Sequence, residues 1–125
     1  MKKVLLVDDD VEFCEATKLL LESKGCEVAV AHNGKEGLEK VRAEPPNLVI
    51  LDVMMPEMNG YDVCVVLKAD PKLKRIPVIL LTGVDQSIFK TTYSQQMGLM
   101  TEADDYIAKP VEPEELVKRV RELLR

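Results

Sequence analysis

Short apolar runs alternate with longer amphipathic stretches along the whole chain. Five short runs bounded by charged or turn-forming residues have strand patterns: four are largely apolar, and the second along the chain alternates. They cover residues 3–7, 26–31, 47–51, 77–81 and 105–108. The stretches between them carry apolar residues at helical spacing and predict helices over residues 11–24, from 33 to about 42, over 60–68 and from 113 onward. A further helix is expected somewhere within residues 82–102.

Local end signals support these helices. Gly25 stands where a left-handed cap would close the first helix. Asn33 and Glu36 have the spacing of a capping box, and Pro113 suits a first helical position. Strands that are apolar throughout and separated by helices indicate a parallel sheet covered on both sides. We therefore expect one α/β domain over residues 1–125, a flavodoxin-like (βα)5 doubly wound parallel sheet with strand order 2-1-3-4-5.

Charge and cysteine content narrow the function. The chain has 22 acidic and 17 basic residues and a net charge of −5, which argues against nucleic-acid binding through a basic face and allows a cation site. The three cysteines, Cys14, Cys26 and Cys64, show no metal-binding spacing and are expected to be buried reduced thiols. With no signal peptide or spanning segment in sight, a cytoplasmic location without membrane attachment is expected.

Polar residues stand where the predicted strands end. In an open parallel sheet, ligands bind outside the carboxyl ends of the strands, where the strand order reverses. With the expected order, the first and third strands are neighbours at that point. The residues concerned are Asp8, Asp9, Asp10, Asp52, Thr82 and Lys109.

Carboxylates gathered in one crevice need a compensating charge. Two of them about 4 Å apart repel by several kcal/mol at an effective dielectric near 20, so the cluster must take up protons or a cation. An open site made of oxygens suits Mg²⁺. A lysine and a hydroxyl beside it complete the groups that phosphoryl transfer requires. A single strand-end aspartate is more often a helix cap, and Asp10 is expected to cap the first helix.

Four segments at the predicted strand ends form a recognisable set of motifs: residues 7–10 (VDDD), 51–60 (LDVMMPEMNG), 81–83 (LTG) and 103–110 (ADDYIAKP). Together they resemble the receiver domains of two-component response regulators, of which the bacterial chemotaxis regulator is a stand-alone example. The similarity runs in order from residue 3 to about residue 124.

The resemblance implies a phosphorylation switch. Asp52 would accept a phosphoryl group from the phosphohistidine of a sensor histidine kinase or of a histidine phosphotransfer protein, as in a phosphorelay. Mg²⁺ would be bound directly by Asp9 and Asp52, by Asp8 through water, and by the main-chain carbonyl of Met54. The only catalytic activity implied is self-phosphorylation and self-dephosphorylation.

The resemblance also implies how the signal is read. Thr82 would hydrogen-bond the phosphoryl group, Lys109 would pair with it, and Tyr106 would act as an aromatic switch. The Lys109–Pro110 bond would be cis. The output surface would be the fourth helix, fifth strand and fifth helix, facing a downstream output domain or protein, with phosphorylation-dependent homodimerisation as a further possibility.

One region departs from the family pattern. Residues 82 and 109 are 27 positions apart, about five more than such domains usually have, in a region where loop length normally varies. The extra residues fall at about 83–93. Glu102 replaces the usual glycine before the ADDY motif, and we expect the longer stretch to reshape the output surface.

Two other functions fit part of the pattern. A phosphatase of the haloacid-dehalogenase type would use Asp8 and Asp10 with Thr82 and Lys109, but Asp52 would then have no role. An unphosphorylated pseudo-receiver would serve only as an interaction module, which the intact set of site residues argues against.

Some chemically suggestive residues are assigned structural roles. His32 is expected to be an exposed loop residue away from the strand ends. Met54, Met55 and Met58 are expected to pack around the loop that follows Asp52.

Overall fold

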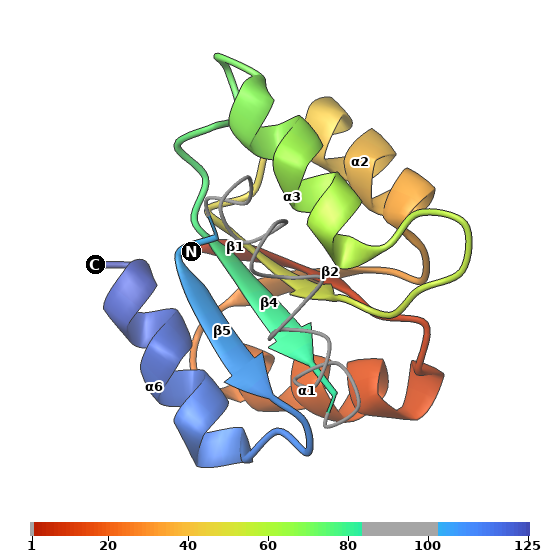
Figure 1. The fold of residues 1–125 in the computed structure, drawn as a ribbon. Helices are drawn as coiled ribbons and strands as arrows, with labels where there is room; N and C mark the ends of the chain where they lie inside the picture. The colour runs from red at the N-terminus through yellow and green to blue at the C-terminus, as the bar shows by residue number, and fades with distance from the viewer. Residues whose placement is uncertain (1, 84–102) are drawn as a thin grey trace.

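The computed structural model describes residues 2–83 and 103–125. Five parallel strands form one sheet in the order β2-β1-β3-β4-β5, which confirms the flavodoxin-like doubly wound topology (Figure 1). The strands are β1 (Lys3–Val7), β2 (Glu27–Ala31), β3 (Leu48–Asp52), β4 (Val78–Thr82) and β5 (Asp105–Ala108). The middle strands β1, β3 and β4 are almost wholly buried, as their continuous apolar runs predict.

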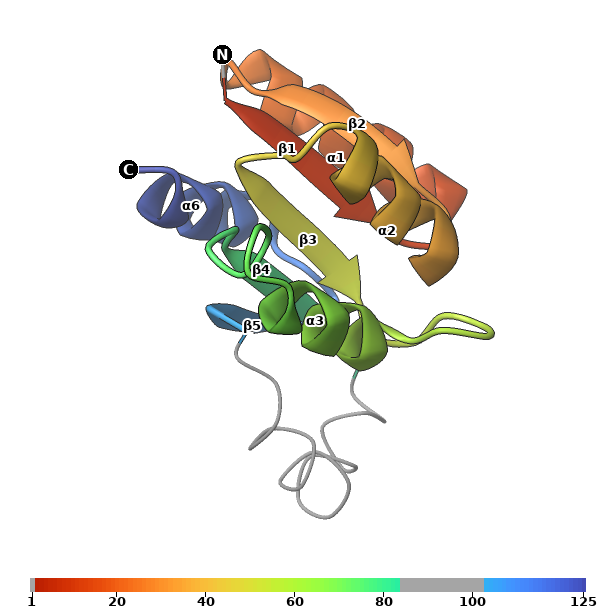
Figure 2. The same cartoon turned by 90° about the horizontal axis from the view of Figure 1, so that it is seen from above.

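Helices cover both faces of this sheet. The described part of the chain contains α1 (Val11–Ser23), α2 (Gly34–Ala43), α3 (Gly60–Ala69) and α6 (Pro113–Leu123). Figure 2 shows α2 and α3 on one face and α1 and α6 on the other. The helix expected within residues 82–102, and the extra residues at about 83–93, lie almost entirely outside the described residues.

The core is divided into two layers by the sheet. Alternate residues of each strand point to opposite faces, so Leu5 packs with the layer under α2 and α3, whereas Leu6 packs with the layer under α1 and α6. Each layer is closed by the apolar stripe of its helices. The three cysteines are free and buried, as predicted.

The helix starts follow their capping residues. Asp10 Oδ1 accepts a hydrogen bond from the Phe13 N–H at 3.1 Å, which confirms the expected cap of α1. Asn33 likewise accepts from the Glu36 N–H at 2.8 Å. The second half of the expected capping box is displaced by one residue, because the Glu36 carboxylate accepts from the N–H of His32 at 2.7 Å.

The strand ends differ slightly from the expected boundaries. Asp52 and Thr82 were expected to follow their strands, but each is the last residue of its strand. Asp52 is in register with Leu81, and Thr82 is in register with Ala108. The sheet itself therefore holds the main chain of both residues. Among the described residues, no helix is long and apolar enough to cross a membrane.

Candidate functional site

Three carboxyl groups meet at the carboxyl edge of the sheet. Asp8 directly follows β1 and Asp52 ends β3, and these two strands are neighbours. Asp8 and Asp52 are buried, whereas Asp9 is exposed. Carboxylate oxygens of all three lie within 4.8 Å of one another. The three carboxyl groups that the strand order predicts together are therefore together, and Asp9 is the exposed one.

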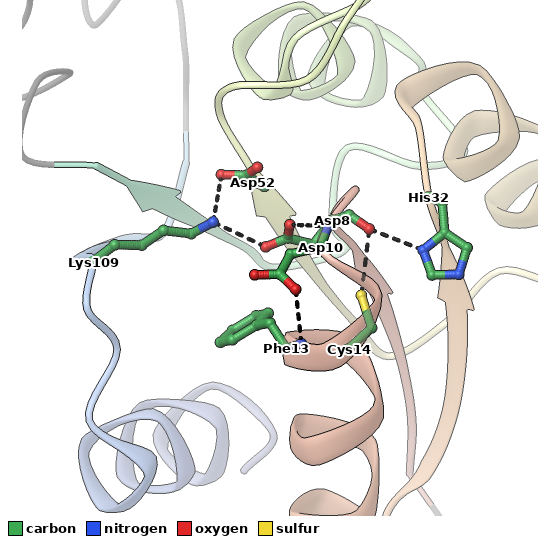
Figure 3. Close-up of polar contacts among 7 residues, drawn as sticks. All are labelled: Asp8, Asp10, Phe13, Cys14, His32, Asp52 and Lys109. Carbon is green, nitrogen blue, oxygen red and sulfur yellow. Dashed lines mark hydrogen bonds and ion pairs between the residues drawn. The ribbon is translucent and has the colours of Figure 1, made fainter.

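Hydrogen bonds hold Asp8 at several of its polar atoms. Its N–H donates to the carbonyl of Ala31 in β2 at 3.0 Å. Its Oδ1 accepts from the Asp10 N–H at 2.9 Å, and its Oδ2 lies 3.1 Å from Lys109 Nζ (Figure 3). Both carboxylate oxygens of Asp8 are thus engaged within the protein.

Lys109 supplies the positive charge of the site. It follows β5, and its ammonium group lies 3.1 Å from Asp8 Oδ2 and 3.1 Å from Asp52 Oδ1. The same group lies 5.5 Å from the centroid of the Phe13 ring, which is within the range of a cation–π contact. Burial lowers the pKa of Lys109, but the nearby carboxylates of Asp52 and Asp8 outweigh this and leave the pKa raised. The Lys109–Pro110 peptide bond is cis, as expected.

The protonation of Asp52 is shifted by its surroundings. Burial and, after it, the negative charge of Asp8 raise its pKa, Lys109 partly opposes the rise, and the net pKa is about 6. One ammonium group faces three carboxyl groups in the crevice. The excess negative charge that remains favours a bound cation.

The donor atoms available fit a hard divalent cation. The three carboxyl groups offer oxygen ligands and no described sulfur or imidazole group joins the cluster. Oxygen donors around a partly open site are the environment in which Mg²⁺ is bound in proteins. The acidic cluster is therefore able to hold a metal ion.

Thr82 and Tyr106 lie on the strands beside this crevice. Thr82 is buried at the end of β4, and its carbonyl accepts the N–H of Lys109. Tyr106 lies in β5 in register with Leu80, and its ring is half-buried against the core layer under α2 and α3. Both residues thus come from strands that end at the same edge as Asp52.

The loop after β3 approaches Asp52 closely. The Gly60 N–H donates to the Val53 carbonyl at 2.9 Å, and a Cβ added to Gly60 would lie 2.4 Å from the carbonyl oxygen of Asp52. Met55 is buried and Met58 is half-buried in the core, as expected. Met54 is 60% exposed, so the expectation that it packs is wrong.

Two groups near the site were not expected from the sequence. The Nδ1 atom of His32 lies 3.1 Å from the main-chain oxygen of Asp8, so the expectation that His32 lies away from the strand ends is wrong, although its side chain is exposed. The Cys14 thiol donates to the same oxygen at 3.3 Å. Burial, followed by the charge of Asp8, raises the pKa of Cys14 to about 12, so the thiol stays protonated. His32 directly follows β2, the neighbour of β1, and this position in the sequence could have predicted that it lies near Asp8.

Comparison with known proteins identifies relatives over almost the whole chain. The response regulator receiver domain family matches residues 4–121. The chain is 42% identical over 124 residues to the DNA-binding response regulator MtrA of Mycolicibacterium paratuberculosis, covering 99% of this chain and 52% of that protein. It thus spans about half the length of this curated relative.

Solved structures agree with this relationship. The receiver domain of a signal transduction histidine kinase from Syntrophus aciditrophicus superposes with a TM-score of 0.88 at 36% identity, covering 99% of this chain and 90% of that one. The chemotaxis protein CheY4 of Vibrio cholerae gives a TM-score of 0.87 at 30% identity, covering 99% of both chains. With the family match, the acidic crevice and the sheet order in agreement, this chain belongs to the response regulator receiver domain family of two-component signalling.

Proposed function

We propose that this chain is a phosphorylation switch whose acceptor is Asp52. The observation that carries the proposal is the position of Asp52 at the end of β3, where its carboxyl group faces both the acidic cluster and the ammonium group of Lys109. The phosphoryl donor is a phosphohistidine on a sensor histidine kinase or on a histidine phosphotransfer protein. Membership of the receiver family supports this class of donor.

The transfer needs an ionised nucleophile and a balanced charge. A carboxylate oxygen of Asp52 forms a bond to phosphorus while the nitrogen–phosphorus bond of the donor histidine breaks. A pKa of about 6 leaves Asp52 mostly ionised at neutral pH. Lys109 lies 3.1 Å from the attacking group and can pair with phosphoryl oxygens. The reaction is self-phosphorylation followed by self-hydrolysis, with no other substrate turned over.

We propose Mg²⁺ as the metal ion, bound by Asp9, by Asp52 and by the main-chain carbonyl of Met54, with Asp8 acting through water. The engagement of both Asp8 oxygens by Asp10 and Lys109 supports an indirect role for this residue. When bound, the ion supplies charge neutralisation for phosphoryl oxygens. Asp9, exposed at the open side of the crevice, is the carboxylate most accessible to it.

Readout starts from the new charge. Phosphorylation adds roughly −1.5 to −2 charges at neutral pH, next to Lys109 and the end of β4. Thr82 then hydrogen-bonds the phosphoryl group, and Tyr106 changes its packing in response, which shifts a two-state equilibrium. The face that includes β5 and α6 carries the change to a downstream output domain or protein. Homodimerisation through this face is one form that the output can take.

Two features weigh against a phosphatase that uses Asp8 and Asp10. Asp8 is fully buried with both carboxylate oxygens engaged, and the Asp10 carboxylate caps α1. Asp8 therefore has no unengaged carboxylate oxygen for nucleophilic attack, and the Asp10 oxygen that caps α1 is already used as an acceptor. The contacts of Lys109 with Asp8 and Asp52 support a phosphoryl-accepting site over a pseudo-receiver, because the full set of groups for phosphoryl transfer is present.

Phosphorylation with a small donor distinguishes the three functions. The protein is incubated with Mg²⁺ and an acyl phosphate, and its intact mass is followed with time. A switch gains the mass of one phosphoryl group and loses it slowly; Asp52→Asn abolishes the gain and Asp10→Asn preserves it. Rapid turnover that depends on Asp8 would indicate a phosphatase. An unchanged mass of the wild-type protein would indicate a pseudo-receiver and overturn the proposal.

A further inference from the structure

The main-chain oxygen of Asp8 is held from two sides. The Cys14 thiol in the first turn of α1 donates to it at 3.3 Å, and His32 Nδ1 lies 3.1 Å from it on the side of β2 (Figure 3). A carbonyl oxygen can only accept hydrogen bonds, so Nδ1 carries the proton in this contact. A carbonyl oxygen has two lone pairs, so the Cys14 thiol and the His32 Nδ1–H together supply the two hydrogen bonds that it can accept.

His32 is itself fixed by its neighbours. Its N–H donates to the Glu36 carboxylate at 2.7 Å, and Glu36 is bound in turn to the cap residue Asn33. The preceding residue, Ala31, accepts the N–H of Asp8 at 3.0 Å. The imidazole therefore reaches Asp8 from a main chain that β2 and the first turn of α2 hold in place.

The consequence reaches Asp9 through the peptide bond. The carbonyl of Asp8 and the N–H of Asp9 belong to one planar unit. A change in the direction of the carbonyl therefore rotates this unit and alters the main-chain torsion angles from which the Asp9 side chain starts. Within residues 2–83 and 103–125, no hydrogen bond or ion pair holds the Asp9 carboxylate, so the main chain is what limits the directions that this group can take.

We propose that His32 is a positioning residue, which acts through the Asp8 carbonyl to orient the Asp8–Asp9 peptide and thereby aims the Asp9 carboxylate into the metal site. The inference rests on the proposed function of the acidic cluster, because it assigns a metal-binding role to Asp9. His32 touches neither the metal ion nor the phosphoryl group. Instead, His32 sets the geometry of the pocket before the metal ion binds, as do the groups that orient metal ligands in other proteins.

Two substitutions distinguish the effect of losing the His32 hydrogen bond from the effect of losing the volume of its ring. His32→Leu has similar reach and no donor, whereas His32→Asn places an amide N–H the same number of bonds from the main chain as Nδ1. Lys35→Leu, at an exposed residue of α2, is the matched surface control. The dissociation constant for Mg²⁺ is measured by calorimetry at one pH, and the Asp9 amide resonance is followed by NMR without added metal.

We expect His32→Leu to raise the dissociation constant about 5-fold or more and to shift the Asp9 amide resonance without Mg²⁺. His32→Asn should restore both, while Lys35→Leu changes neither. His32→Ala replaces His32→Leu if that variant does not fold. The inference about His32 would be overturned if His32→Leu bound Mg²⁺ as tightly as wild type. It would also be overturned if His32→Asn did not restore wild-type affinity. Neither result would affect the proposed metal site. A wild-type protein that binds no Mg²⁺ would overturn the proposed metal site as well.

Discussion

The ammonium group of Lys109 lies 3.1 Å from Oδ1 of Asp52, although the two residues come from strands that are not adjacent in the sheet. The side chain reaches past the end of β4 and also contacts Asp8 at the same distance. One cation thus links the ends of β1 and β3. Phosphorylation of Asp52 would offer the same ammonium group a new anionic partner, so this contact connects the charge of the site with β5.

Removing Lys109 should destabilise the protein when no metal ion is added. Lys109→Met leaves the buried carboxyl groups of Asp8 and Asp52 without their counter-ion, which we expect to cost about 1–3 kcal/mol of unfolding free energy. Urea unfolding at neutral pH measures the loss, with Lys35→Met as the surface control. Saturating Mg²⁺ should recover part of it. Equal stability of Lys109→Met and wild type without Mg²⁺ would mean that the ion pairs contribute nothing.

Asp52 should make stability depend on pH. The pKa of Asp52 is raised from 3.8 to about 6 in the folded state. Protonated Asp52 therefore contributes fully to the unfolding free energy below pH 3.8, and this contribution is lost as the pH rises through about 6. Without Mg²⁺, the unfolding free energy of Asp52→Asn relative to that of wild type should therefore increase by about 2–3 kcal/mol from pH 4 to pH 7.5. Urea unfolding at both pH values measures this. A constant difference between the two proteins would show that the pKa of Asp52 is close to its ordinary value.

Gly60 should be indispensable for the position of Asp52. A Cβ at this residue would lie 2.4 Å from the Asp52 carbonyl oxygen, a contact that only main-chain movement relieves. We expect Gly60→Ala to reduce phosphoryl uptake from an acyl phosphate at least 10-fold. Gly25→Ala is the control, because Gly25 has a φ of 92° but nothing within 4 Å of an added Cβ. That variant should lose about 1 kcal/mol of stability and keep normal uptake.

Lys68 should act as a structural anchor outside the site. Its ammonium group donates to the carbonyls of Lys74 and Ile76 and to Asp104, whose carboxylate also accepts the Val78 N–H. The side chain is 8% exposed. Lys68→Met removes three hydrogen bonds and should cost about 2–3 kcal/mol in urea unfolding. Lys72→Met is the comparison and should change stability by less than about 0.5 kcal/mol.

The fold and most of the site followed from sequence patterns with a direct physical cause. Apolar runs such as residues 47–51 are buried on both faces, so their limits were correct to within one residue. Asp8, Asp9 and Asp52 were expected together because parallel strands end at one edge. The switch roles of Thr82 and Tyr106 came from the resemblance to receiver domains and stay predictions.

Other features depend on side-chain directions that a sequence does not determine. An exposed histidine in a turn is normally solvated, and only the adjacency of β1 and β2 brings His32 to the Asp8 carbonyl. Phe13 reads as an ordinary apolar residue of α1, yet its ring lies under Lys109. Met54 was expected to pack around the loop after Asp52, but it is exposed. Each case reflects the local course of the main chain.

The central claim is that Asp52 receives the phosphoryl group. The most direct measurement is site mapping of the protein by mass spectrometry after reaction with an acyl phosphate and Mg²⁺. We predict one phosphoryl group on the peptide that contains Asp52, absent when Mg²⁺ is chelated and absent in Asp52→Asn. A phosphoryl group found on a peptide containing Asp8 instead, or no modification of a folded wild-type protein, would contradict the account.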